Sequence, residues 1–161
     1  MGYKALRTFQ QAEEIYSLIK EFTSEYLDPM ADKRLIGHMN DCGRSIKQNI
    51  AEGHGRGDTK ANLDFLGFSM GSLTELLEDC FDLEKDIKEE RRKTKNDEEG
   101  LRILSKIIKL LMGEKTMLAR QIEGLQHRFV EKGDEKEDLK KDRQDYQKRQ
   151  IVNNYNRRHW S

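Results

Sequence analysis

Apolar residues recur at steps of three and four along four long stretches of the chain, a spacing that places them on one face of an α-helix. The first helix is expected to end near Leu27, because the residue before Pro29 is pushed out of the helical region. Its apolar stripe consists of Leu6, Phe9, Ala12 or Glu13, Tyr16, Ile19, Phe22 and Tyr26.

A second helix follows, with Asp32 as its expected N-cap. Its stripe consists of Leu35, Met39, Cys42, Ile46, Ile50 and Gly53. The steps of four, three, four, four and three resemble a coiled-coil seam, so this helix is expected to contact its neighbours through a narrow apolar stripe.

A third helix is predicted from about residue 60 to about residue 92, with Asp58 or Thr59 as its N-cap. Its broader stripe includes Leu63, Leu66, Met70, Leu73, Leu77, Cys80, Phe81, Leu83 and Ile87, flanked by Phe65, Phe68 and Leu76. Gly67 and Gly71 share a face, and each costs about 1 kcal/mol relative to alanine inside a helix. We therefore expect another backbone to approach them closely, within the bundle or across a subunit interface.

A fourth helix is predicted over about residues 97–130. Its stripe consists of Leu101, Leu104, Ile108, Leu111, Leu118, Ile122, Leu125 and Phe129. Four amphipathic helices with short connections predict an all-α, antiparallel up-down four-helix bundle over residues 1–130. Residues 131–161 form a charged C-terminal extension that is expected to be partly disordered.

Composition agrees with long, thin helices, because 37% of the 161 residues are charged and 35% are hydrophobic. The formal net charge is zero, so no global field indicates a nucleic-acid or membrane partner. Cys42 and Cys80 are too far apart for a CxxC motif, and no histidine is spaced to complete a zinc site, so buried thiols are expected. No leader or membrane-spanning segment is recognisable, which favours a cytoplasmic protein. No metal or cofactor is expected.

Two segments carry a family resemblance: RSIKQNIAEGHGRG and, after a short gap, FLGFSMGSLTELLE. They resemble the small four-helix bundle proteins that are also called large-subunit ribosomal RNA intervening-sequence proteins. The first block falls on Arg44, Asn49 to Gly53, Gly55 and Arg56, and the second on Phe65 or Phe68, Gly71, Ser72, Leu73, Glu75 and Leu76. His54 departs from the family, which more often has an aromatic residue there, and the C-terminal extension has no counterpart.

The resemblance implies a homopentameric helical bundle that is not an enzyme. It also implies a relation to the accessory protein of diversity-generating retroelements, a pentamer that binds a reverse transcriptase and its template RNA. The expected partners are therefore further copies of this chain, RNA and a reverse transcriptase. The family-motif residues with an expected structural role are Asn49, Glu52, Gly53, Gly55, Gly71, Ser72 and Glu75.

The glycines of NIAEGHGRG, residues 49–57, could cradle a phosphate, but this segment follows a helix and lacks the GK[ST] ending of a phosphate loop. A structural corner is favoured, in which Gly53 takes the left-handed conformation that closes a helix. Asn49 and Glu52 are expected to hydrogen-bond the exposed backbone of this corner. A partner-contacting site built on the corner remains the alternative.

Arg44, Lys47, Arg56 and Lys60 form a local basic cluster around the corner, joined by His54 when it is protonated. The cluster is either a solvated helix face or a surface that contacts a phosphate backbone. A pentamer would repeat such a surface five times.

The segment from Tyr146 onward has no acidic residue and interleaves cations with aromatic side chains, as suits single-stranded nucleic acid. Its candidate contacts are Lys148, Arg149, Tyr155, Arg157, Arg158 and Trp160. Docking on a protein with Trp160 as an anchor, or an inert tail, remains open.

One enzymatic alternative remains. Arg120 and His127 fit the R-x4–6-H pattern of ribonucleases of the HEPN class, in which they would stabilise the phosphorane and transfer protons. Such a loose pattern also arises by chance in a highly charged helix. A scaffold that binds RNA or a reverse transcriptase is the favoured function.

Overall fold

The structure is a computed structural model that describes residues 2–132, 141 and 143–149. Its body consists of four long helices: α1 (Arg7–Tyr26), α2 (Lys33–Gly55), α3 (Thr59–Lys88) and α4 (Asp97–Lys132). The described residues contain no strand, which confirms the all-α class. A short 3-10 helix, η1 (Tyr3–Ala5), precedes α1 and was not predicted from the hydrophobic pattern.

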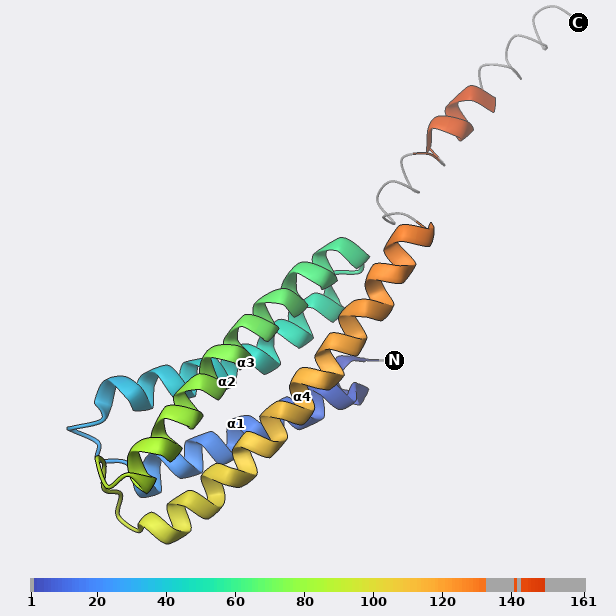
Figure 1. The fold of residues 1–161 in the computed structure, drawn as a ribbon. Helices are drawn as coiled ribbons and strands as arrows, with labels where there is room; N and C mark the ends of the chain where they lie inside the picture. The colour runs from blue at the N-terminus through green and yellow to red at the C-terminus, as the bar shows by residue number, and fades with distance from the viewer. Residues whose placement is uncertain (1, 133–140, 142, 150–161) are drawn as a thin grey trace, which may run out of the picture.

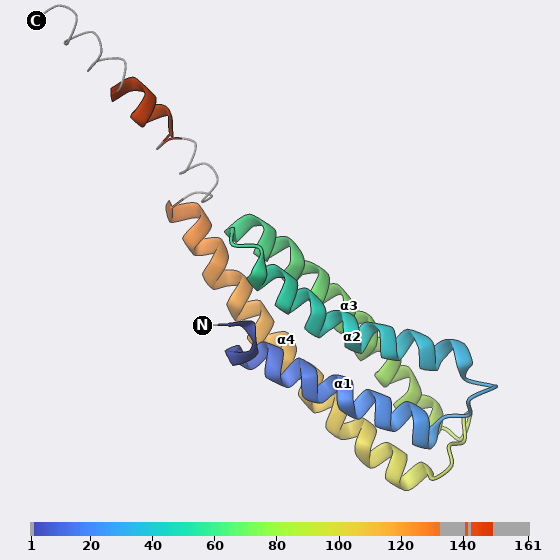
Figure 2. The same cartoon turned by 180° about the vertical axis from the view of Figure 1, so that it is seen from behind.

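The four long helices surround one core, since α2 and α4 each pack against both α1 and α3. Figure 1 and, from behind, Figure 2 show each long helix running back alongside the one before it. The α1–α2 and α3–α4 connections lie at one end of the molecule. The α2–α3 connection lies at the other end, beside the second half of α4 (Figure 1).

Most helix bounds agree with the hydrophobic pattern. Helix α1 ends at Tyr26, and Asp32 occupies the N-cap position of α2. The Asp32 carboxylate makes no capping bond; it accepts the Asp28 N–H at 3.0 Å and pairs with Arg92. Helix α3 ends at Lys88 rather than near residue 92, because Glu90 adopts a left-handed φ of 58°.

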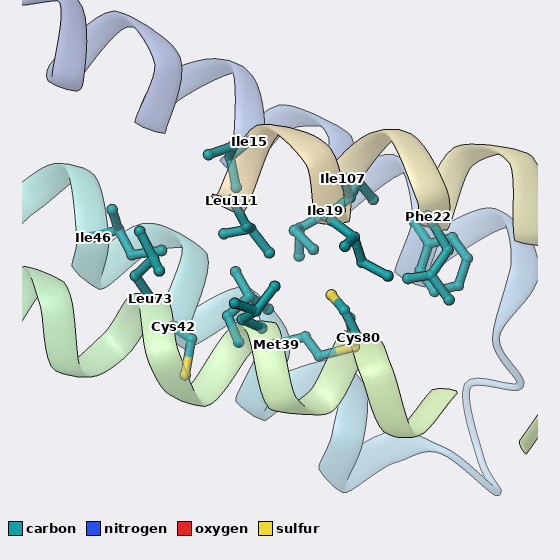
Figure 3. Close-up of a cluster of buried hydrophobic side chains, with 14 of the residues drawn as sticks. Ile15, Ile19, Phe22, Met39, Cys42, Ile46, Leu73, Cys80, Ile107 and Leu111 are labelled. Carbon is teal, nitrogen blue, oxygen red and sulfur yellow. The ribbon is translucent and has the colours of Figure 1, made fainter. Parts of the chain in front are cut away.

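All four helices contribute fully buried aliphatic side chains to the core shown in Figure 3. The sulfur of Cys80 points into this cluster, whereas the sulfur of Cys42 points away from it (Figure 3). Both are buried free thiols, as predicted. Burial raises the pKa of both thiols, that of Cys42 to about 12, so neither is an activated nucleophile.

One core position of α4 is a carboxylic acid. Glu114 is fully buried, and neither of its carboxyl oxygens has a hydrogen-bond partner among the described residues. Desolvation raises its pKa to about 8, so the side chain is mostly neutral at pH 7. The periodic pattern alone did not identify this buried acid.

None of the described helices combines the length and the apolar character that crossing a bilayer requires.

Candidate nucleic-acid interface

The α2–α3 corner is built differently from the sequence expectation. Helix α2 continues through Gly53 to Gly55, and the Arg56 N–H donates to the Gly53 carbonyl at 3.3 Å. The left-handed residue is Gly57, with a φ of 73°, so the prediction that Gly53 takes this conformation is wrong. Asp58 then starts α3 by accepting the Ala61 N–H at 2.8 Å, which confirms the predicted cap.

Gly53 instead permits the close approach of two helices. A Cβ at this position would lie 2.8 Å from Asn62 Oδ1 and 2.9 Å from Phe65 Cβ, both on α3. Any side chain here would therefore push α3 away from α2. Asn62 Oδ1 is itself buried and has no hydrogen-bond partner among the described residues.

Asn49 and Glu52 make their side-chain contacts along α2, and Ser72 of α3 bonds to the same helix. Asn49 donates to Ser45 Oγ at 3.0 Å, and Glu52 pairs with Arg56 at 2.5 Å. Ser72 also donates to Ser45 Oγ, at 2.9 Å, which ties α3 to α2. These contacts replace the loop hydrogen bonds that the sequence suggested for Asn49 and Glu52.

A cleft of about 430 Å³ separates the corner from the second half of α4. Arg120 and Arg128 line its α4 wall, together with Gly124 between them. These three residues are spaced four apart, so they lie on one face of α4. The remaining lining residues are Leu6, Gly53, His54, Gly57, Asp58, Thr59, Asn62, Gln121 and Leu125. We call this feature the corner cleft.

A second hollow, of about 820 Å³, lies at the end of α2. Its lining combines Tyr3 of η1 with Asn49, Glu52, Gly55 and Arg56 of the first motif block. Gln48 and Ala51 complete it. The two clefts have separate linings, with Gly53 and His54 in the corner cleft and Asn49, Glu52 and Arg56 in the second hollow.

The basic residues predicted around the corner do not form one compact cluster. Lys47 lies against α1, 3.7 Å from a Glu13 oxygen and 5.3 Å from the Tyr16 ring centroid. Arg56 pairs with Glu52 and lies 5.1 Å from the Phe65 ring centroid. Arg44 and Lys60 are exposed. Arg44 and Arg56 stand about 18 Å apart along α2, given twelve residues at 1.5 Å each.

The predicted contacts of the extension are only partly described. Lys148 and Arg149 are exposed in the helical segment 143–149. Tyr155, Arg157, Arg158 and Trp160 lie outside the described residues.

Arg120 and His127 do not share a cleft. His127 lies 3.4 Å from Glu131 and lines a separate hollow with Glu123, Gln126 and Val130. It stands about 10 Å further along α4 than Arg120, which faces the corner cleft. The two residues of the ribonuclease pattern therefore line different hollows.

Residues 4–113 match the model of the 23S rRNA-intervening sequence protein family. The chain belongs to this family. Both motif blocks lie inside the matched region, which confirms the resemblance seen in the sequence. A search of curated proteins found no significant match.

The family match has a consequence for the corner cleft. The corner wall of the cleft lies within residues 4–113, whereas Arg120 and Arg128 lie beyond them. One wall of the cleft therefore lies in the segment that matches the family, and the opposite wall, on α4, lies outside it. Sequence reasoning overlooked Arg128, although the four-residue spacing of Arg120, Gly124 and Arg128 was visible.

Proposed function

We propose that this protein is a non-enzymatic, homo-oligomeric scaffold that binds RNA at the corner cleft. The observation that supports this most directly is the pair of guanidinium groups, Arg120 and Arg128, on one wall of a cleft beside the family's glycine corner. Guanidinium groups suit phosphate oxygens because their planar fork donates two parallel hydrogen bonds. The family name, which refers to 23S ribosomal RNA, is compatible with an RNA-related role.

Assembly into a homopentamer, which the family resemblance implies, would use the exposed face of α3. At Gly67 and Gly71, no heavy atom of the described chain lies within 4 Å of where a Cβ would stand. The expected close approach is therefore not made within one chain. Phe68, between these glycines, is 59% exposed. A second backbone that packs across the glycines would cover this ring, and five copies would make weak RNA contacts act together.

A reverse transcriptase is the further partner that the resemblance implies. The exposed Lys148 and Arg149 and the basic, aromatic residues of the extension are the proposed second contact surface for RNA. The HEPN-like ribonuclease remains the less favoured alternative, because Arg120 and His127 face different hollows.

The corner cleft is tested by an Arg120→Gln/Arg128→Gln double variant of the full chain. Binding of a labelled, mixed-sequence single-stranded RNA would be measured by fluorescence anisotropy over a salt series. Loss of two phosphate contacts should weaken binding and lower the slope of log K against log salt by about 1.4, since each contact contributes about 0.7. A Lys106→Gln/Lys109→Gln variant removes equal charge from exposed positions of the same helix and serves as the control.

If the two double variants weaken RNA binding equally, binding follows net charge alone, and the corner cleft is rejected as the RNA-binding site. A chain that ends at residue 145 tests the extension. If its RNA affinity and salt slope equal those of the full chain, the extension has no part in RNA binding and protein docking becomes its favoured role. RNA cleavage that a His127→Ala substitution abolishes would instead establish the ribonuclease alternative.

A further inference from the structure

A cluster of metal-ligating side chains lies between α2 and α3, on the surface away from the corner cleft. His38 and Cys42 are one helical turn apart on α2, and Glu75 and Asp79 are one turn apart on α3. Cys42 Sγ lies 3.7 Å from His38 Nε2 and 3.5 Å from Glu75 Oε2. His38 Nε2 lies 3.6 Å from Glu75 Oε2. Three different ligand atoms therefore converge on one point.

These separations agree with a tetrahedral zinc ion. Zinc binds thiolate sulfur at about 2.3 Å and imidazole nitrogen or carboxylate oxygen at about 2.0–2.2 Å. Tetrahedral angles then place sulfur about 3.6 Å from each of the other ligand atoms, and nitrogen about 3.4 Å from oxygen. Each observed separation differs from these values by about 0.2 Å or less. The three ligand atoms thus already stand near three corners of a zinc-centred tetrahedron.

Asp79 supplies the supporting contact that zinc-bound histidines usually have. Its Oδ2 lies 2.6 Å from His38 Nδ1. A carboxylate only accepts hydrogen bonds, so Nδ1 carries the proton and donates it. In the neutral ring, the lone pair of Nε2 then faces Cys42 and Glu75. This arrangement fixes both the tautomer and the orientation of the ring.

We propose that His38 Nε2, Cys42 Sγ and a Glu75 carboxylate oxygen bind one Zn²⁺ ion, with Asp79 holding the histidine ring. The thiol proton of Cys42, which now points to Glu75, is released to solvent when the zinc–sulfur bond forms. The site lies beside a hollow of about 520 Å³ that His38, Gly71, Glu75 and Asp79 help to line. We expect a water molecule from this hollow as the fourth ligand.

The proposed zinc site does not rest on the proposed RNA binding. The sequence offered no histidine spaced to complete a zinc site, whereas the fold brings His38, Cys42 and Glu75 together. The other thiol, Cys80, points into the core and belongs to no such cluster among the described residues (Figure 3). It therefore provides a matched control. Cys42→Ser, His38→Gln and Glu75→Gln each remove one ligand, and the last two alter exposed side chains whose loss leaves the core intact.

The test uses the full chain and two metals. Co²⁺ should produce the near-ultraviolet charge-transfer absorption of a cobalt–thiolate bond and the visible bands of tetrahedral Co²⁺, at one ion per chain. Zn²⁺ should displace it stoichiometrically. Zinc affinity, measured by competition with a chromophoric chelator, should fall by about 10- to 100-fold in Asp79→Asn and by at least that much in each ligand variant.

The Cys80→Ala variant should keep both the charge-transfer absorption and the affinity. Circular dichroism would establish that each variant is folded. The proposal is overturned if wild-type protein binds cobalt without the thiolate absorption. It is equally overturned if Cys80→Ala abolishes that absorption while His38→Gln and Glu75→Gln retain wild-type affinity.

Discussion

Replacing Glu114 with methionine should stabilise the protein, and the gain should grow with pH. In the folded protein, burial raises the pKa of this carboxyl from 4.5 to about 8. The unfolded chain therefore releases a proton that the folded chain retains between these two values. The contribution of this group to the free energy of unfolding is therefore greatest below about pH 4.5, and it falls as the pH rises from there to about 8.

The magnitude follows from the same shift. The carboxyl reduces the free energy of unfolding by about 1 kcal/mol at pH 5 and about 3 kcal/mol at pH 7, relative to an unshifted group. Methionine has a similar length and no titrating proton, and it also removes two buried oxygens that have no partner among the described residues. The stabilisation by Glu114→Met should thus be about 2 kcal/mol larger at pH 7 than at pH 5.

Urea unfolding followed by circular dichroism at both pH values, at equal protein concentrations, measures this difference. Glu123→Met changes an exposed glutamate of the same helix and should show no comparable growth with pH. If the gain from Glu114→Met is the same at pH 5 and pH 7, the carboxyl does not titrate as its burial requires, and the reasoning is refuted.

Two further predictions concern glycines and the exposed ring of α3. Gly53→Ala should lower the free energy of unfolding by about 1–3 kcal/mol, because the new methyl group clashes with Asn62 and Phe65. Gly37→Ala, in open space on the same helix, should raise it by up to about 1 kcal/mol; equal effects would contradict the close approach. Phe68→Glu should reduce the oligomer to smaller species in light scattering without loss of helicity, and a monomeric wild-type protein would reject assembly altogether.

The helices were predictable from sequence because their signals are local. Pro29 and the Asp58 cap set two boundaries, and apolar spacing set the faces. The residue that takes a positive φ was misplaced, because Gly53, Gly55 and Gly57 are equivalent in a purely local pattern. The fold distinguishes them: Gly53 is needed because Asn62 and Phe65 pack against it, and Gly57 is needed because its φ is positive.

The functional residues were harder to predict because they come from different helices. The corner cleft joins residues more than 60 positions apart, such as His54 and Arg120, and no spacing rule connects them. The His38–Cys42 pair did carry a local signal, one helical turn, but Glu75 and Asp79 reach it only after α3 folds back along α2. A search of α2 for ligands one turn apart would have found half of the zinc site.

Two connections at one end of the bundle are bonded to each other. At one end, Asp32 pairs with Arg92, and the Lys95 N–H donates to the Tyr26 carbonyl at 3.2 Å, so the α1–α2 and α3–α4 turns are joined to each other. The α2–α3 turn at the other end faces α4 across the corner cleft. The hydrogen bond to Tyr26 should protect the Lys95 amide from hydrogen exchange, although Lys95 lies in a turn. A substitution that breaks the Asp32–Arg92 pair should then loosen two turns at once, although the two residues lie 60 positions apart in the sequence.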